Sequence, residues 1–193
     1  MHNKMASPKR VAFKFLKKLR QRIRGRNVPA GSSPEDRWKT GGPLGTLYRD
    51  KSGQWNTFAR VGGKKITVSL DSEGSEKLEV GDDISKAEQL FVKIVRNIGR
   101  YTDLTAKGVW KDHSKFILEE AFEITQEMNP SFSVEQVPTS VKELALMMKP
   151  QDLWVSDEGS GYMVYEPMEI FGEHSPVADL GPGGILIETY IDG

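Results

Sequence analysis

The chain has 193 residues, of which 37% are hydrophobic and 28% are charged, and it contains no cysteine. This length favours one domain with a hydrophobic core over two independent domains. The lack of cysteine excludes disulfides, thiolate nucleophiles and cysteine-ligated metal sites.

Apolar runs in the chain are short. None approaches the 18 to 20 residues, roughly, that a membrane-spanning helix needs, and the amino terminus has no apolar segment of the kind a secretory signal requires. We therefore expect no transmembrane segment and a cytoplasmic protein, which could attach peripherally to a membrane.

The formal net charge of zero hides a strong asymmetry. Residues 1–34 contain ten Lys or Arg and no Asp or Glu, whereas the rest of the chain holds 17 bases and 27 acids. The sequence thus predicts a basic segment attached to an acidic body. All ten bases precede Asn27, and we call residues 1–26 the arm.

The arm has the pattern of an amphipathic helix. Ser7 and Pro8 suit its first positions, Gly25 suits its end, and Ala12, Leu16, Leu19 and Ile23 follow the helical period with Phe15 beside them. Residues 27–43 are rich in Pro and Gly and predict a flexible linker. We expect one domain from Leu44 to Gly193, preceded by this arm and linker over residues 1–43.

Residues 44–70 predict three strands of an antiparallel sheet. Gly62 and Gly63 suit a two-residue hairpin turn. In the last of these strands Ile66, Val68 and Leu70 alternate with polar residues, which indicates one buried face.

Three helices are predicted next, over residues 83–99, 112–130 and 139–150. In the first, Ser85 and Glu88 have capping-box spacing and Gly99 marks the end. In the third, Ser140 and Glu143 have the same spacing. The apolar faces are predicted to comprise Ala87, Leu90, Phe91, Ile94 and Ile98, then Ile117, Ala121, Ile124 and Met128, and finally Val141, Leu144, Ala145 and Met148.

Strands return after Lys149. A hairpin is predicted around Gly159–Gly161, a strand over residues 168–183 interrupted at Gly172 and Pro176 follows, and residues 183–192 form a last strand with alternating side chains. The order of three strands, three helices and four strands predicts an α+β fold with an antiparallel sheet packed by helices.

Glu173 and His174 are adjacent acid and imidazole groups. On a regular strand their side chains point to opposite faces, so joint proton transfer or metal binding requires a bulge, for example at Gly172. The sequence shows no zinc-like set of ligands, no phosphate-binding loop and no serine triad. His174, Glu173 and Asp157 are the catalytic candidates if the protein is an enzyme, and a structural role is the alternative. We predict no cofactor and no metal.

Acidic residues cluster in the last 40 residues of the chain. They could form a solvated rim that prevents strand pairing, or a surface that binds a basic protein partner. The candidate partner-binding residues are Asp157, Glu158, Glu166, Glu169, Glu173 and Asp179.

The arm could bind an anionic membrane or nucleic acid, or it could dock on the body or serve as a solubilising tail. The residues that would contact an anionic partner are Lys9, Arg10, Lys14, Lys17, Lys18, Arg20, Arg22 and Arg24.

Residues 44–193 resemble a family of small bacterial α+β domains of unknown function. The similarity rests on a Trp-bearing hairpin, an acidic Gly hairpin, a Tyr strand and a Phe-Gly-x-His segment, with Trp55, Asp157, Gly159, Tyr165, Phe171, Gly172, His174 and Gly193 as the matching residues. In this family Gly tends to precede His directly, whereas Glu173 occupies that position here. The resemblance implies a cytoplasmic domain without established catalysis, with relatives of the immunity or interaction type.

Three functions follow as hypotheses. The first is a non-enzymatic binding protein whose acidic body binds a protein partner, as an immunity-type inhibitor does. The second is a hydrolytic or metal-dependent enzyme built on His174 and nearby carboxylates. The third is attachment to membrane or nucleic acid through the arm.

Overall fold

The structure is a computed structural model that describes residues 36–72 and 77–192. The arm, with its predicted helix and its eight candidate basic residues, lies outside the described residues, as does Gly193.

Eight strands and four α-helices make up the fold of the described residues. The strands are β1 (Arg37–Lys39), β2 (Thr46–Arg49), β3 (Trp55–Val61), β4 (Lys64–Asp71), β5 (Pro150–Ser156), β6 (Gly161–Tyr165), β7 (Ser175–Gly181) and β8 (Ile185–Asp192). The helices are α2 (Ser85–Arg96), α3 (Ile98–Glu119), α4 (Ala121–Met128) and α5 (Val141–Met147), with short 3-10 helices η2 (Val134–Gln136) and η3 (Glu169–Phe171).

All eight strands join one sheet, whose spatial order follows the chain from β1 to β8. Neighbouring strands are antiparallel, except that β4 and β5 are parallel. A parallel pair requires a long crossover connection, and here the helical segment between β4 and β5 supplies it. The predicted α+β class is confirmed. The predicted order of three strands before the helices is not confirmed, because four strands precede them. The sheet also contains one parallel pair and is therefore mixed, whereas an antiparallel sheet was expected.

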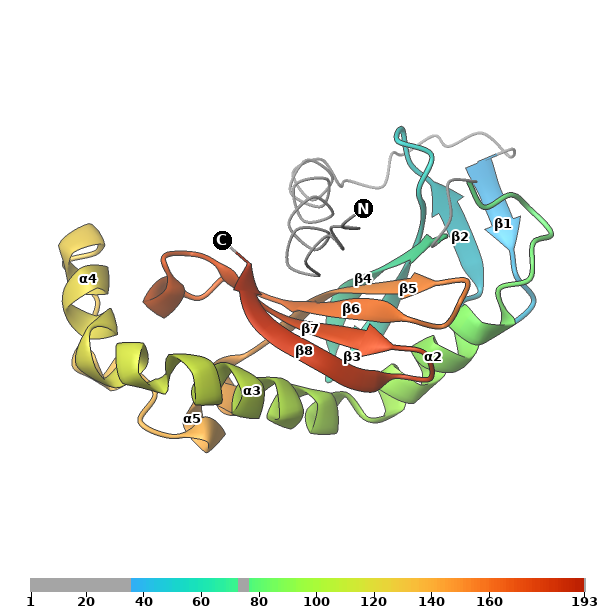
Figure 1. Ribbon diagram of the computed structural model, residues 1–193. Coiled ribbons are helices and arrows are strands. Elements are labelled where there is room, and N and C mark those ends of the chain that lie inside the picture. The colour runs from blue at the N-terminus through green and yellow to red at the C-terminus, as the bar shows by residue number, and fades with distance from the viewer. Residues whose placement is uncertain (1–35, 73–76, 193) are drawn as a thin grey trace, which may run out of the picture.

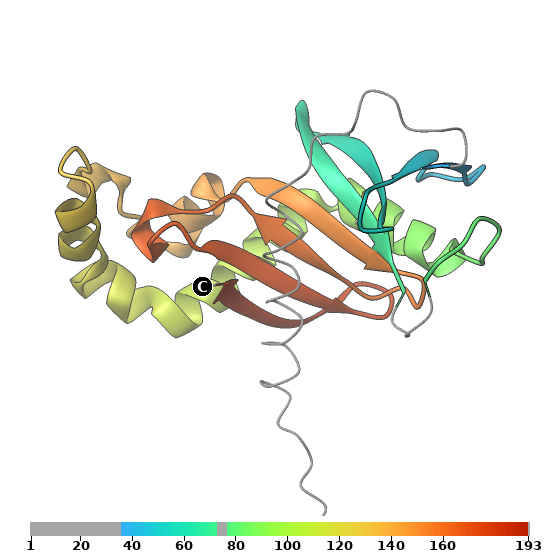
Figure 2. The same ribbon diagram turned by 90° about the horizontal axis from the view of Figure 1, so that it is seen from above.

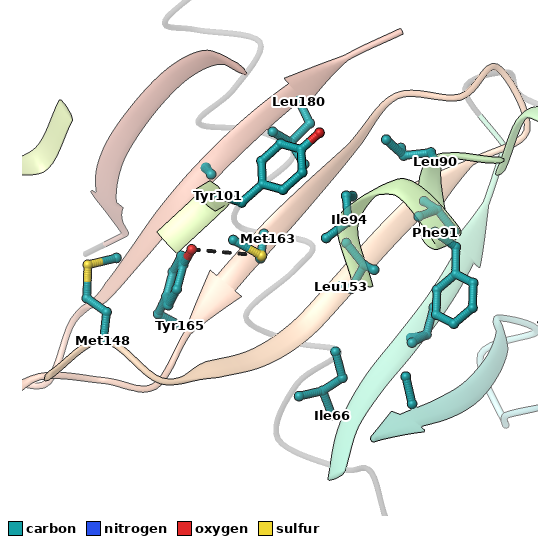
Figure 3. Close-up of a cluster of buried hydrophobic side chains, with 14 of the residues drawn as sticks. Ile66, Leu90, Phe91, Ile94, Tyr101, Met148, Leu153, Met163, Tyr165 and Leu180 are labelled. Carbon is teal, nitrogen blue, oxygen red and sulfur yellow. Dashed lines mark hydrogen bonds between the residues drawn. The ribbon is translucent and has the colours of Figure 1, made fainter. Parts of the chain in front are cut away.

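Helices α2 and α3 run along one face of the sheet (Figure 1) and are seen beneath it in the perpendicular view (Figure 2). Apolar side chains of this face meet those of the helices in the main core (Figure 3). Leu90 and Ile94 of α2 and Leu153, Met163 and Leu180 of the sheet are each at most 1% exposed. Residues on alternate positions of each strand therefore bury against α2 and α3.

A small polar network lies inside this core. The Tyr165 hydroxyl is within hydrogen-bonding distance of Thr102 and Thr105 of α3, at 3.3 Å from each hydroxyl oxygen. Burial raises the pKa of Tyr165 to about 12, although these hydrogen bonds oppose the shift. Tyr101 donates a hydrogen bond of 2.8 Å to the carbonyl oxygen of Gly184. These contacts fix α3 against the last three strands.

The predicted hairpins are confirmed. Gly62 and Gly63 both have positive φ between β3 and β4, as a two-residue hairpin turn requires. The hairpin of β5 and β6 turns at Gly159, where φ is +81°.

The predicted linker is wrong for residues 37–39. These residues form β1, which pairs with β2 in antiparallel register. Trp38 is 5% exposed and packs edge-on against Trp55, with ring centroids 5.6 Å apart. Burial of a large aromatic side chain stabilises this strand despite the Gly and Pro residues that flank it. The sheet thus begins at Arg37 and not near Leu44.

The predicted boundaries of the first two helices need correction. Gly99 does not end a helix, because α2 ends at Arg96 and α3 begins at Ile98 and continues to Glu119. The expected capping box of Ser85 and Glu88 is also absent. The Glu88 carboxylate instead accepts hydrogen bonds from the Thr40 hydroxyl (2.7 Å) and the Leu44 amide (3.4 Å). This tertiary contact ties the β1–β2 connection to α2.

Ile117 and Ala121 are buried as predicted, but Ile124 and Met128 are 44% and 64% exposed. The helical path breaks at Glu120, where φ is −127°. The break redirects α4, so that Ala121 and Thr125 are its buried residues. The prediction of one continuous apolar face across residues 112–130 is therefore wrong.

The third predicted helix is confirmed as α5. Ser140 accepts a hydrogen bond from the Glu143 amide at 3.2 Å, as in a capping box. The Glu143 carboxylate, however, accepts from the amide and hydroxyl of Thr139, at 2.7 and 2.8 Å. Leu144 and Met148 are buried.

Candidate functional site

The face of the sheet opposite α2 and α3 carries a chemically distinct surface on β5 to β8. In one cross-strand row Trp154 lies beside Tyr162, Tyr162 beside Asp179, and Asp179 beside Glu188. A second row joins Asp152, Val164, Val177 and Tyr190. Residues directly opposite on paired strands share a face. We call these eight residues, with Asp192 two positions beyond Tyr190, the acidic face.

The centre of the acidic face is apolar and aromatic. Trp154, Val164 and Val177 form a second buried cluster, separate from the main core, and Tyr162 and Tyr190 pack against it half-buried. Trp154 is 2% exposed and Val177 fully buried. The carboxylates of Asp152, Asp179, Glu188 and Asp192 occupy the surrounding positions of the same face.

The pKa of Tyr190 is raised by burial and by the nearby carboxylates of the acidic face. Burial raises the pKa of Tyr190, and the negative potential of Tyr162, Asp179, Asp192 and Glu188 raises it further. Carboxylates that disfavour a tyrosinate must lie near it. The three strands β6, β7 and β8 thus concentrate negative charge around one phenol.

No basic residue of the same strands offsets this charge. Residues 150–192 contain nine Asp or Glu and no Lys or Arg. Bases on this side of the sheet occur at the β3–β4 end, where the Lys65 ammonium lies 3.5 Å from the centroid of the Phe58 ring. The face is therefore polarised, with its acidic half on β5 to β8.

The structure does not bring the six predicted partner-binding acids together. Asp157 and Glu158 lie in the β5–β6 turn, where Glu158 forms a 2.9 Å ion pair with Lys86. Glu166, Glu169 and Glu173 follow β6 at the other end of the sheet. Asp179 alone among the six belongs to the acidic face.

Two of the acids at the far end of β6 contact other elements. Glu166 forms an ion pair with Lys64, and the Glu169 carboxylate accepts a hydrogen bond of 3.3 Å from the side-chain amide of Asn129. These contacts connect β6 to β4 and η3 to the end of α4, a structural role.

Glu173 and His174 lie in a tight turn before β7, whereas the sequence predicts one interrupted strand over residues 168–183. Helix η3 ends at Phe171, Gly172 caps it with φ of +63°, and Glu173 follows with φ of +64°. A backbone hydrogen bond from Met168 to the His174 carbonyl closes the turn at 3.1 Å.

The turn separates His174 from the third catalytic candidate. His174 immediately precedes β7, whereas Asp157 lies at the opposite end of the β6–β7 pair, beyond Gly161 and Leu180. Five strand residues span roughly 17 Å. Asp157 and His174 therefore cannot act on the same atom in this arrangement.

Neither of two surface clefts near this region involves His174. One, of about 190 Å³, lies between η3 and α5 and is lined by Phe132, Gln136, Met147, Lys149, Glu166, Pro167, Met168, Glu169 and Ile170. The other, of about 550 Å³, is an open groove at the β4–β6 end, lined by Lys64, Lys65, Thr67, Gln151, Asp152, Glu166 and Pro167. The first combines charged side chains with apolar walls, whereas the second is lined almost entirely by polar and charged side chains, with Thr67 of β4 directly opposite Asp152 of β5.

Within residues 36–72 and 77–192, no three His, Asp or Glu side chains are grouped so that they could hold a metal ion. None of the helices in this part of the chain is long and apolar enough to span a membrane.

Sequence reasoning missed most of the acidic face. Trp154, Tyr162 and Tyr190 were not singled out, nor were Asp152, Glu188 and Asp192. A signal was present in the alternation of each strand, which places Glu188, Tyr190 and Asp192 on one side of β8. The order of the strands in space, which joins the three rows, is available only from the fold.

Comparisons with protein-family models, with curated proteins and with solved structures found no match to this chain. The resemblance to the family of small bacterial domains therefore rests on the sequence pattern alone.

Proposed function

We propose that the protein is a non-catalytic binding protein and that the acidic face binds a basic segment of a protein partner. The observation that carries this proposal is the composition of the face: a buried aromatic and aliphatic centre bordered by four carboxylates, on strands that contain no Lys or Arg. An inhibitor of the immunity type, which covers a cationic surface of its target, is the kind of protein that such a face suits.

Each part of the face supports binding of a cationic and partly apolar ligand. Tyr162 and Tyr190, which are half-buried, can supply contact area with little loss of conformational freedom, and Tyr is enriched at protein interfaces. Aromatic faces also attract Lys and Arg side chains. The carboxylates of Asp179 and Glu188, opposite each other on β7 and β8, add electrostatic complementarity, which selects partners by charge and accelerates encounter.

A defined peptide tests the proposal. The probe is a 20-residue amphipathic peptide with Leu on one helical face and Lys on the other, and the matched peptide has Glu in place of Lys. The protein is the full chain with Lys17, Lys18, Arg20 and Arg22 changed to Glu, so that its own arm does not compete. We call this the arm-reversed variant. Binding is measured by calorimetry and by the change in Trp154 fluorescence, with Trp154→Phe to identify the Trp154 signal.

We expect the Lys peptide to bind and the Glu peptide not to bind. Adding Asp179→Lys and Glu188→Lys should weaken binding at least about tenfold, since both charges lie on the acidic face. Glu123→Lys with Glu127→Lys, which makes the same charge change on exposed positions of α4, should leave the affinity unchanged. Absence of binding, or an equal loss in both charge-reversed proteins, would contradict the proposal.

A further inference from the structure

The chain itself contains a segment complementary in charge to the acidic face. Residues 1–26 hold ten Lys or Arg and no acid, whereas the acidic face holds the carboxylates of Asp152, Asp179, Glu188 and Asp192 on strands without Lys or Arg. Two segments of opposite charge within one molecule attract each other unless the chain keeps them apart.

The pattern of the arm also matches the chemistry of the face. Its apolar stripe of Leu16, Leu19 and Ile23 is flanked by Lys and Arg on both sides, and the face has an apolar aromatic centre with carboxylates around it. A helix over residues 8–24 would be about 26 Å long. Strand β8, with eight residues, spans a similar length of about 26 Å.

The connection between the arm and the sheet is long enough. The described chain enters the sheet at β1, one edge, and β6 and β7 lie five and six strands away. At about 4.8 Å per strand this is roughly 24 to 29 Å. Residues 27–35 can span up to about 31 Å when extended, so the arm can reach the centre of the acidic face of its own chain.

We propose that the arm binds the acidic face of its own chain and acts as an intramolecular ligand that a basic partner must displace. This inference rests on the proposed function, because it assigns the resting occupant of the same surface. A tethered ligand has an effective concentration in the millimolar range, so it lowers the apparent affinity of an external competitor without abolishing binding. Partners with few charges would be rejected, and only a strongly basic, amphipathic segment would displace the arm.

Spin-label distances in the full-length protein test the docking directly. The chain has no cysteine, so Gln21→Cys in the arm and Lys111→Cys on α3 give one label pair. We expect one narrow distance distribution in low salt. The four arm substitutions, which lower the net charge of residues 1–26 from +10 to +2, should broaden it, and so should Asp179→Lys with Glu188→Lys, which change the summed charge of the four carboxylate positions from −4 to 0. The α4 charge reversal, Glu123→Lys with Glu127→Lys, should leave it narrow.

A broad distribution in the natural chain, or one unaffected by charge reversal on the acidic face, would overturn the proposal. So would a narrow distribution that arises only after addition of phosphatidylserine vesicles or duplex DNA, since the arm would then be bound by an anionic surface and not by the protein.

The Lys peptide separates failure of this inference from failure of the proposed function. If the arm docks, the arm-reversed variant binds the peptide at least about tenfold more tightly than the natural chain. Equal binding by both proteins would refute docking and retain the binding function. No binding by either protein would refute the binding function.

Discussion

Gly108 of α3 lies against Thr189 of β8, so close that a Cβ atom on Gly108 would overlap the Thr189 side chain. The threonine is β-branched and is held on a strand, so it cannot swing aside as a long side chain would. The absence of a side chain at position 108 is thus what lets α3 approach the last strand of the sheet, on the face opposite the acidic carboxylates.

The first prediction concerns this contact. Gly-to-Ala changes inside a helix normally stabilise it by up to about 1 kcal/mol, but Gly108→Ala should destabilise the protein by about 1 to 3 kcal/mol through overpacking. Gly99→Ala in the same helix is the matched control, because a Cβ there meets nothing within 4 Å. Urea denaturation measures the unfolding free energy of both variants. Stabilisation by Gly108→Ala would show that α3 does not lie this close to β8.

The two glycines also explain why the sequence predicted this helix incompletely. The sequence pattern predicts a helix end at Gly99 and no regular element for residues 100–111, which include Gly108. In the structure both glycines have helical conformation inside α3. Gly108 is required because α3 packs there against Thr189 of β8, which lies 81 positions later in the chain. A tertiary contact at that separation leaves no local signal, whereas the Gly62–Gly63 turn depends only on neighbouring residues and was predicted correctly.

In the candidate site, too, the sequence predicts what depends on neighbouring residues and does not predict what depends on contacts between distant segments. Strand alternation predicted which residues of β8 share a side, but not which strands lie next to them. Acids that are close in sequence, such as Glu158 and Glu166, proved to lie at opposite ends of β6. Charge composition identified the acidic body, and only the sheet order identified the surface on which aromatic side chains and carboxylates meet.

The second prediction uses the two expected capping boxes. Ser140→Ala should cost about 1 kcal/mol, because the Ser140 hydroxyl accepts from the Glu143 amide at the start of α5. Ser85→Ala should cost only a few tenths of a kcal/mol, since Ser85 is not the cap of α2 and the cap position, Ile84, makes no side-chain hydrogen bond. Chemical denaturation of the two variants side by side decides this. Equal losses would mean that Ser85 caps α2 after all.

The third prediction concerns the turn at Glu173. Among the described residues it is the non-glycine residue with positive φ, a conformation that costs about 1 kcal/mol when a Cβ is present. Glu173→Gly should therefore be more stable than Glu173→Ala by up to about 1 kcal/mol, after allowance for the greater flexibility of glycine in the unfolded chain. Both changes remove the same charge, so the comparison isolates the backbone. Lower stability of the glycine variant in thermal melts would refute the left-handed conformation of this turn.

The last prediction is a pH dependence that Tyr165 creates. Burial raises the pKa of its phenol from 10 to about 12, so the folded state holds the proton more tightly than the unfolded state. The stability associated with the neutral phenol is complete below pH 10 and is lost as the pH rises through 12. The loss should approach roughly 2 to 3 kcal/mol, since each pKa unit corresponds to about 1.4 kcal/mol. Tyr165→Phe should be less stable at neutral pH, because it loses the contacts with Thr102 and Thr105, but its unfolding free energy should fall less steeply between pH 10 and 12. Urea titrations across this range compare the two proteins. Parallel curves would mean that the Tyr165 phenol ionises in the folded state as readily as in the unfolded chain, and that its place inside the core is wrong.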